Sequence, residues 1–230
     1  MLLPDVLRAR VRSAAGSTVH RAWAWAAEVG ATGPGDRRSR RFGALGTGSC
    51  IAFPPGAVFG ERLITVGCDT MIGPHVSLAV GMHPDEPLQV PGGVVLSIGD
   101  RCMIGRGTSI VGRCRIDIGD DVTTGPNVYI TDHNHTYDDV GIPIGRQWPA
   151  EEAVSIGAGS WLATGVVVLP GARIGRHVTV AAGSVVRGTI PDYSVIAGAP
   201  AKVVRRHVEG EGWVPPLRRQ VVAPEWWIVD

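Results

Sequence analysis

One short polar segment of this chain, residues 131–139, holds the side chains best suited to acid–base chemistry. It reads Thr-Asp-His-Asn-His-Thr-Tyr-Asp-Asp and so places two imidazoles and three carboxylates within nine residues. In an extended chain alternate side chains point the same way, so His133 and His135 would share one face. A histidine near neutral pH can take a proton from a hydroxyl or an amine, and a neighbouring carboxylate can fix its tautomer. The segment therefore predicts a general base on a loop, unless its polar groups only order that loop by hydrogen bonding.

The elements that must position this loop repeat every six residues. Between residues 154 and 186 a branched aliphatic residue returns at each sixth position. These residues are Ile156, Leu162, Val168, Ile174, Val180 and Val186. Six is the period of the hexapeptide β-solenoid, in which three hexads make one triangular coil of about 18 residues. The pattern predicts aliphatic side chains that point into a prism and small residues at its tight corners.

The same period recurs upstream in three blocks, with a slip of two residues between the last two. The blocks cover residues 66–78, 98–116 and 118–130. All blocks together amount to roughly six coils of about 18 residues, enough to bury a continuous core. The sequence therefore predicts an all-β fold, a parallel β-helix, over residues 45–206. Two loops are expected to interrupt it, at residues 79–95 and 131–153, and loops of this length are often functional.

Residues 1–44 and 207–230 flank the repeat. In the first segment apolar residues recur at helical spacing over residues 4–29, which predicts an amphipathic helix that ends at Gly30. Residues 36–41 then form a basic linker, which is expected to be solvated, with a lipid or polyanion site as the minority interpretation. The last segment is expected to be a tail or a short helix.

The composition excludes several classes of function. The chain has 230 residues and a formal net charge of +1, and 6% of its residues are aromatic. Because the net charge is close to zero, the molecule as a whole has no positive electrostatic field that would attract nucleic acid, and a nucleic-acid partner is not expected. Charged residues interrupt the apolar stretches of the N-terminal segment before they reach membrane-spanning length, so we expect a cytoplasmic protein without an integral membrane segment. The four cysteines include no CxxC pair, which argues against zinc-ribbon and thioredoxin-like sites.

Several stretches in a fixed order make the chain resemble the hexapeptide-repeat acyltransferases. They are Asn134-His135, Ser155-Ile156-Gly157, Ser160-Trp161-Leu162, Ala182-Gly183-Ser184-Val185-Val186, and Ala197-Gly198-Ala199-Pro200-Ala201-Lys202. The single hexads are unspecific, but this ordered combination is specific. The resemblance covers about residues 60–206 and points to the maltose/galactoside O-acetyltransferase branch, to which the xenobiotic acetyltransferases are related.

The resemblance implies a left-handed β-helix and an acetyltransferase that uses acetyl-CoA and requires no metal. It also implies a homotrimer, with acetyl-CoA and the acceptor bound in clefts between neighbouring prisms. When the sequences are aligned without gaps from Ile118, the family's catalytic base falls on His135, and His133 is the reserve candidate. The base would take a proton from the acceptor hydroxyl, which then attacks the thioester carbonyl.

The resemblance further implies which residues bind the coenzyme. Trp161 offers an apolar face to the pantetheine arm or the thioester, and Thr164 and Ala182 match positions whose backbone groups meet the pantetheine amides. Basic residues near the end of the repeat would bind the phosphates through charge-assisted hydrogen bonds. These residues are Lys202, Arg205 and Arg206.

Two departures from the family pattern bear on the ligands. The family's Thr-Lys pair before an Ile-Pro step is Arg187-Gly188 here, so the cation expected at the adenine end of the coenzyme moves by one residue. Galactoside transferases place acceptor-binding Asn and Asp where this chain has Gly105 and Arg113, so a galactoside pocket is not expected. The acceptor is expected to be sugar-like, and a sugar, a sugar nucleotide, a lipid-linked glycan and an amine all stay open.

Two other functions stay open on the same fold. A zinc enzyme like the γ-type carbonic anhydrases needs three converging imidazoles. His133 and His135 are close in sequence, but a third imidazole would have to come from another coil or another chain. The candidates for it are His75, His83 and His177. A non-catalytic scaffold or binding module is the second alternative, although it needs neither a histidine loop nor a basic end of the repeat.

Overall fold

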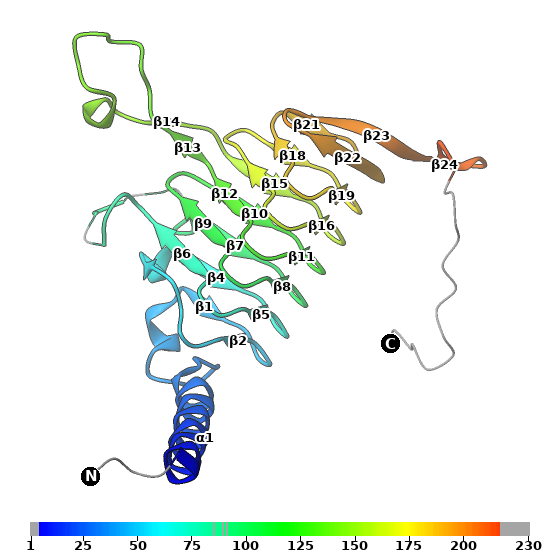
Figure 1. Cartoon of the computed structure of the whole chain (residues 1–230). Coiled ribbons are helices and arrows are strands. Elements are labelled where there is room, and N and C mark those ends of the chain that lie inside the picture. Colours follow the sequence, from blue (N-terminus) through cyan, green and yellow to red (C-terminus); the bar gives the residue numbers. More distant parts are fainter. Residues whose placement is uncertain (1–4, 85, 89, 91, 217–230) are drawn as a thin grey trace.

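Short strands separated by tight corners wind into a triangular prism (Figure 1). This computed structural model describes residues 5–84, 86–88, 90 and 92–216, and for residues 5–11 it describes only the backbone. Three parallel sheets form the sides of the prism, and each coil adds one strand to each sheet. The fold is the left-handed parallel β-helix that the resemblance implied.

In all three sheets the strand order along the prism follows the order along the chain. The first sheet contains β1 (Ala44–Leu45), β4 (Ile64–Val66), β7 (Leu96–Ile98), β10 (Ile116–Ile118), β15 (Val154–Ile156), β18 (Arg173–Ile174) and β21 (Thr189–Ile190). The second contains β2 (Cys50–Ile51), β5 (Met71–Ile72), β8 (Met103–Ile104), β11 (Thr123–Thr124), β16 (Trp161–Leu162), β19 (Thr179–Val180), β22 (Ser194–Gly198), β23 (Ala201–Val208) and β24 (Gly212–Val214). The third contains β3 (Val58–Phe59), β6 (Ser77–Val80), β9 (Ser109–Gly112), β12 (Tyr129–Thr131), β17 (Val167–Val168) and β20 (Val185–Val186).

The core is a column of aliphatic side chains that point inward from these short strands. The six hexad residues between positions 154 and 186 are all buried, as their spacing predicted. In the first sheet β10 buries both Ile116 and Ile118, and Ile116 pairs with Leu96 of the preceding coil. The slip of two residues in the sequence repeat is therefore a strand with two inward-pointing residues, and the stacking of the coils continues through it.

The corners bring the backbones of consecutive coils so close together that side chains are excluded. At Gly157 a Cβ atom would lie 2.5 Å from the carbonyl carbon of Gly175 in the next coil. At Gly183 φ is +67°, in the left-handed region that glycine adopts without steric cost. Such corners help to explain why the chain contains 32 glycines.

Helix α1 (Asp5–Gly30) precedes the prism and ends at the glycine expected from the sequence. It stands at the end of the prism where the first coil begins (Figure 1), and the ring centroid of Trp23 lies 6.5 Å from that of Phe53 in this coil. No helix among the described residues is both long enough and apolar enough to span a membrane. Three short 3-10 helices also occur, η1 (Ser39–Arg41), η2 (Glu61–Leu63) and η3 (Ile144–Arg146).

Two excursions leave the prism, and their limits differ from those expected from the sequence. The first begins after Val80 instead of at residue 79, because β6 pairs with β9 through Val80. The second begins after Thr131, the last residue of β12, and contains its own antiparallel hairpin. That hairpin consists of β13 (His133–Asn134) and β14 (Ala150–Glu151).

The C-terminal segment, expected to be a tail or a short helix, contains strands and no helix in its described part. β22 turns back into β23, and β24 then pairs antiparallel with β23. The expected boundary at residue 206 falls inside β23, which continues to Val208. The turn between β23 and β24 spans residues 209–211, and its central Gly210 has a φ of +80°, which glycine adopts without steric cost. Residues 217–230, with Trp226 and Trp227, lie outside the described part of the chain.

Candidate active site

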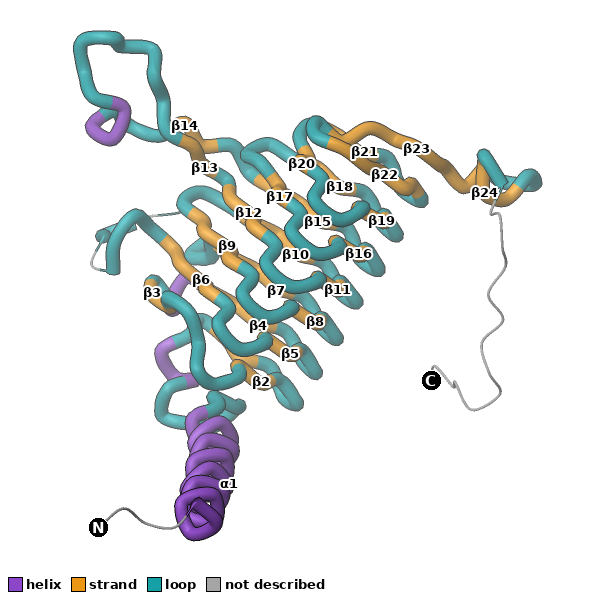
Figure 2. The backbone as a smooth tube through the Cα atoms, in the orientation of Figure 1, coloured by secondary structure: helices purple, strands orange, loops and turns teal. Residues whose placement is uncertain are grey.

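Both excursions project from the same edge of the prism, where the third sheet turns into the first (Figure 2). The first follows β6 and the second follows β12, and the coil between them passes this edge in a short corner at residues 113–115. β6, β9 and β12 are neighbours in the third sheet, so the three corners are stacked. The described residues of segments 81–94, 113–115 and 132–153 therefore lie at one edge of the prism.

Asp132 anchors the second excursion to the prism. Its side chain is fully buried, and its two carboxylate oxygens accept hydrogen bonds from the backbone N–H groups of Arg113, Cys114 and Arg115 at 2.7–2.9 Å. Burial by itself raises the pKa of Asp132, but the hydrogen bonds from His133 and from these backbone groups outweigh it and hold the pKa below its ordinary value. The start of the excursion is thus fixed by a charged group inside the protein.

His133 is held by this carboxylate. Its Nδ1 lies 3.0 Å from Asp132 Oδ1 and 3.3 Å from Thr131 Oγ1, and its side chain is only 17% exposed. Residue 133 also pairs with Glu151 across the hairpin. The imidazole of His133 is therefore oriented by an acidic partner and mostly covered.

His135 lies at the exposed side of the same loop. Its backbone N–H is bonded to Asn134 Oδ1 at 3.1 Å, and its ring makes no hydrogen bond or ion pair with any described residue. The two histidines that share one sequence pattern thus have different surroundings. His133 is paired and mostly covered, whereas His135 is exposed and its ring has no partner among the described residues.

The corner between the two excursions supplies a buried arginine. The side chain of Arg113 is 3% exposed, its Nη2 lies 2.7 Å from Glu86 Oε1 in the first excursion, and its Nε lies 3.2 Å from Glu151 Oε1 in β14. Its guanidinium carbon also lies 4.5 Å from the ring centroid of Trp148. One arginine of the intervening coil therefore contacts both excursions.

Sequence reasoning treated Arg113 only as a departure from the family pattern and did not single out its partners. A sequence signal for these partners does exist, because Arg113 lies in the chain between two loops that both carry carboxylates. The pairing itself depends on the stacking of three corners, which are far apart in the chain. It was therefore not predictable before the register of the coils was known.

The residues expected to bind the coenzyme lie mainly on the second sheet. Trp161 in β16 is half exposed, while its neighbour Leu162 is buried in the core. From Trp161 the strand register runs across the sheet through Thr179 and Val195 to Arg205. At the usual strand spacing of ~4.8 Å these three steps span about 14 Å. Trp161 and Arg205 thus mark the two ends of one row on the outer face.

Three of the other expected coenzyme residues occupy two different edges. Thr164 and Ala182 lie at exposed, stacked corners between the second and third sheets, where the Gly183 N–H donates to the Thr164 carbonyl at 2.9 Å. Lys202 is exposed on β23. Arg187 is also exposed, but it follows β20 at the edge between the third and first sheets. The structure therefore separates Arg187 from the other basic residues.

The loop that carries the histidines and the corners expected to hold the coenzyme lie on opposite edges of the third sheet. His135 comes after β12, at the end of a third-sheet strand, whereas Thr164 comes before β17, at the start of the next one. Trp161 lies on the second sheet, beyond Thr164. A single chain thus does not bring His135 and Trp161 together.

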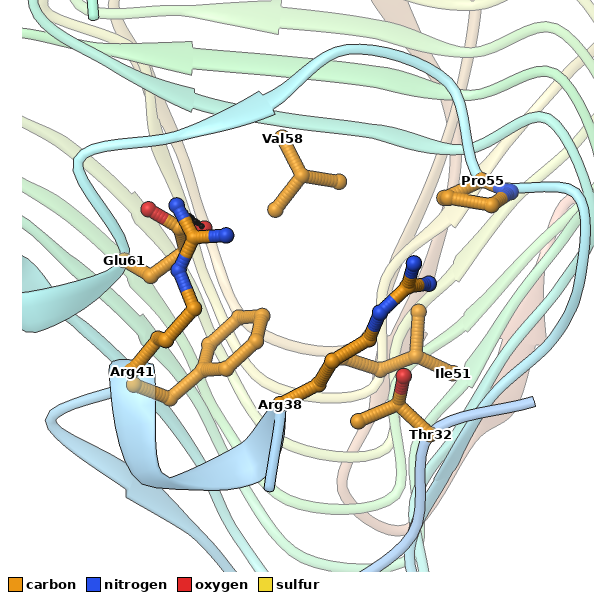
Figure 3. A pocket seen from close by; sticks show the side chains of 8 residues that line it. Thr32, Arg38, Arg41, Ile51, Pro55, Val58 and Glu61 are labelled. Atoms are coloured by element: carbon orange, nitrogen blue, oxygen red, sulfur yellow. Dashed lines mark ion pairs between the residues drawn. The ribbon is translucent and has the colours of Figure 1, made fainter. Parts of the chain in front are cut away.

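A separate pocket opens at the first coil of the prism (Figure 3). Its lining residues are Thr32, Arg38, Arg41, Phe42, Ile51, Pro55, Val58 and Glu61. Arg41 Nη2 and Glu61 Oε1 form an ion pair at 3.0 Å, so one arginine of the basic linker has a carboxylate partner. None of the residues expected to act in chemistry lies in this pocket.

The described residues of one chain contain no group of three His, Cys, Asp or Glu side chains arranged to hold a metal ion. His133 has a carboxylate neighbour, Asp132, but that carboxylate is occupied by three backbone N–H groups. A zinc site of the carbonic anhydrase kind would therefore require ligands from another chain.

Comparison with known proteins identifies the family. Residues 153–188 match the family described as bacterial transferase hexapeptide (six repeats). A putative acetyltransferase of Saccharomyces cerevisiae is 33% identical over 135 residues, which are 59% of this chain and 68% of that protein. The chain belongs to the hexapeptide-repeat acyltransferase family.

Two further proteins extend the comparison. A putative lipopolysaccharide biosynthesis O-acetyl transferase of Escherichia coli is 42% identical over 99 residues, which are 40% of this chain and 50% of that protein, so the chain spans about half of its length. A mutant of AntD, an N-acyltransferase from Bacillus cereus solved with dTDP-4-amino-4,6-dideoxyglucose and coenzyme A, matches with a TM-score of 0.60 and 16% identity over 74% of this chain and 86% of that one. The likeness to AntD shows a shared fold.

The cysteines of this member of the hexapeptide-repeat family differ in their expected reactivity. Burial, followed by the charge of Asp132, raises the pKa of Cys114 to about 11, and burial also raises the pKa of Cys102. The thiolate is the reactive form, so both thiols are protonated and unreactive at about pH 8. We expect iodoacetamide to alkylate the exposed Cys68 first, as measured by peptide mass mapping of the folded protein. Alkylation of Cys114 as fast as Cys68 would contradict this, and denatured protein, in which all thiols react, is the control.

Proposed function

We propose that this chain transfers an acetyl group from acetyl-CoA to a hydroxyl of a sugar-like acceptor, with His135 as the general base. The observation that carries the proposal is the exposed imidazole of His135, which has no partner among the described residues and follows the firmly anchored Asp132. Family membership supports it, because the Escherichia coli and Saccharomyces cerevisiae relatives are named as acetyl transferases. The structure of His133 also supports it, since a covered ring bound to a carboxylate is less accessible to an acceptor.

The reaction is a direct transfer between two bound substrates. His135 takes the proton of the acceptor hydroxyl as its oxygen attacks the thioester carbonyl carbon of acetyl-CoA. The carbonyl oxygen becomes an oxyanion, which backbone N–H groups can stabilise. When the C–S bond breaks, the protonated imidazole returns its proton to the departing thiolate. The products are the acetyl ester and free coenzyme A, and the histidine is restored.

Coenzyme binding is assigned to the outer row of the second sheet and to its corners. Trp161 would contact the pantetheine arm or the thioester, and the backbone groups of Thr164 and Ala182 would bind the pantetheine amides. Lys202 and Arg205 would pair with phosphates, since charge-assisted hydrogen bonds to phosphate are strong. The row of about 14 Å from Trp161 to Arg205 suits an extended ligand with an apolar end and an anionic end. Arg187 would act at the adenine end only from another copy, because it lies on a different edge.

A homotrimer is part of the proposal. The histidine loop and the coenzyme corners lie on opposite edges of one chain, so an active site with both needs the loop of one copy beside the corners of the next. Light scattering coupled to size-exclusion chromatography measures the mass in solution. A monomer that is fully active would contradict this arrangement.

The acceptor is proposed to be a carbohydrate. The Escherichia coli relative is named for lipopolysaccharide biosynthesis, and AntD was solved with a nucleotide-linked amino sugar. The first relative favours oxygen as the nucleophile and the second favours nitrogen. We propose a hydroxyl, because the relative with the higher sequence identity is an O-acetyl transferase.

The test measures binding and turnover separately. Calorimetry with coenzyme A and acetyl-CoA tests the coenzyme site, and release of free thiol in the presence of an acceptor panel tests transfer. Undetectable binding at about millimolar coenzyme would favour the scaffold function, since even weak specific sites reach millimolar dissociation constants. Stoichiometric zinc in the purified protein, with carbonate hydration, would favour the carbonic anhydrase function.

Replacement of Trp161 by alanine should weaken acetyl-CoA binding by about tenfold, because a half-exposed tryptophan at a ligand site contributes on the order of 1–2 kcal/mol through contact area. Calorimetric Kd values of the variant and the wild type check it. Trp25→Ala is the matched control, because Trp25 is also exposed but lies on α1. Equal Kd values for Trp161→Ala and Trp25→Ala would remove Trp161 from the coenzyme site.

A further inference from the structure

The ring of Trp148 is unusual because one face is covered by a charge and the side chain as a whole is open to solvent. The guanidinium carbon of Arg113 lies 4.5 Å from its ring centroid, while the Trp148 residue is 71% exposed. A guanidinium over an aromatic ring is an attractive arrangement, stronger where the cation is buried. The covered face is therefore fixed, and the opposite face is left as a flat apolar surface.

The guanidinium that covers one face of this ring is itself held by two carboxylates. Arg113 is fixed by Glu86 at 2.7 Å and Glu151 at 3.2 Å, one from each excursion. The backbone carbonyl of Trp148 accepts a hydrogen bond from Thr136 Oγ1 at 2.7 Å. One face of the ring is thus backed by the guanidinium of Arg113, and the backbone of Trp148 is tied to the loop by Thr136.

The same hydrogen bond ties Trp148 to the proposed base. Thr136 follows His135 directly in the chain, so the residue beside the base is bonded to the backbone of Trp148. The pairing of His133 with Glu151 and of Asn134 with Ala150 brings these two segments together from the other end of the hairpin. A ligand on the ring would therefore lie on the excursion that carries His135.

The described residues of the two excursions and of the corner between them carry more acidic than basic side chains. The acidic residues are Glu86, Asp132, Asp138, Asp139, Glu151 and Glu152, and the basic residues are Arg113, Arg115 and Arg146. Glu86 and Glu151 pair with Arg113, so the cation behind the ring is neutralised. This excess of negative charge disfavours a phosphate group at the ring, whereas an uncharged ligand is not repelled.

We propose that Trp148 is the acceptor platform, on which an uncharged pyranose ring stacks through its C–H groups, and this rests on the proposed function. The face of an aromatic ring is electron-rich, so it attracts the weakly positive C–H groups of a sugar and does not require a charge. Polar groups of the same excursion would accept hydrogen bonds from the sugar hydroxyls. The acceptor is accordingly a neutral glycoside or the neutral end of a glycan, and Arg113 is the positioning residue that holds its platform.

Saturation-transfer NMR on the full chain tests this without turnover. The probes are methyl glycosides of glucose, galactose, mannose, rhamnose and N-acetylglucosamine, with dTDP-glucose as the anionic competitor. We expect signal transfer to the ring protons of at least one neutral glycoside, a loss of about fivefold or more in Trp148→Ala, and retention in the aromatic control Trp148→Phe. Trp25→Ala, which removes an exposed tryptophan on α1, should bind the glycoside as the wild type does.

Two outcomes would contradict the assignment of Trp148 as the acceptor platform. They are the absence of saturation transfer to all neutral glycosides and an unchanged signal in Trp148→Ala. Preferential binding of dTDP-glucose would replace the neutral acceptor by a sugar nucleotide. A change of oligomeric mass in Trp148→Ala, with no change in glycoside binding, would show that a second copy covers the ring. Glycoside binding that depends on Trp148 in a protein with no acetyl-CoA binding would instead leave the platform standing and overturn the proposed transfer reaction.

With an acceptor identified, kinetics separate a platform from a general structural role. Trp148→Ala should raise the KM for the acceptor by at least about tenfold and change the KM for acetyl-CoA by less than about twofold, because only acceptor binding uses the ring. Equal increases in both constants would mean that the substitution disturbs the whole site and would contradict the proposal.

Discussion

Replacement of His135 by alanine is expected to lower the rate of acetyl transfer by at least about 100-fold, because a positioned general base typically contributes about 10²–10⁴-fold. The side chain is exposed and its ring makes no contact of hydrogen-bond type with the described residues, so the fold should be unaffected. Thiol release at saturating acetyl-CoA measures the rate. Calorimetry should give an unchanged Kd for acetyl-CoA.

His133→Ala is the matched control for this prediction. It removes the other imidazole of the loop but leaves the three backbone hydrogen bonds to Asp132, so we expect a loss of less than about tenfold. The reverse result, with full turnover in His135→Ala and a large loss in His133→Ala, would assign the base to the pair of His133 and Asp132. Circular dichroism and oligomeric mass should match the wild type in both variants.

Asp132→Ala is expected to lower the free energy of unfolding by about 3 kcal/mol or more. Each buried donor left without an acceptor costs roughly 1–3 kcal/mol, and this substitution removes the acceptor of three backbone N–H groups. Urea unfolding at neutral pH measures the difference. Asp132→Asn is the control, because it keeps one acceptor oxygen without the charge and should lose less. A decrease below about 1 kcal/mol for Asp132→Ala would mean that the anchor does not hold the excursion.

The same residue predicts how stability depends on acid. Its folded pKa lies below the ordinary value of 3.8, so the ionised carboxylate stabilises the folded state at every pH above that value. This stabilisation declines as the pH falls through the lowered folded pKa, where Asp132 takes up a proton. In Asp132→Asn that part of the acid dependence should be absent.

The six-residue repeat predicted the prism because each hexad forms one short strand and one corner, so one side chain in every six points inward. Each of the six hexad residues from Ile156 to Val186 points into the core, and the helix before the repeat ends at the expected Gly30. The limits of the excursions were less predictable, since Val80 is as apolar as any strand residue. The β23–β24 hairpin was missed because its Gly-containing turn was taken as part of a tail.

Only those parts of the candidate site that lie within one short stretch of sequence were predictable. The polar segment around His135 stands out by residue type, and Trp161 stands out within a hexad. The contacts of Arg113 with Glu86 and Glu151 join residues that lie far apart in the chain but on stacked corners. Such contacts depend on which coils are neighbours, and that follows from strand register instead of from motif spacing.

The pairing of β10 with β15 is unaffected by the long excursion between them. Ile116 lies opposite Val154 and Ile118 lies opposite Ile156, as if residues 132–153 were not there. An insertion at this edge therefore leaves the stacking of the coils unchanged. We expect that loops of other lengths and sequences can connect the same two strands, provided that an anchor equivalent to Asp132 is retained. The loop could then diverge in sequence while the coils of the prism stay the same.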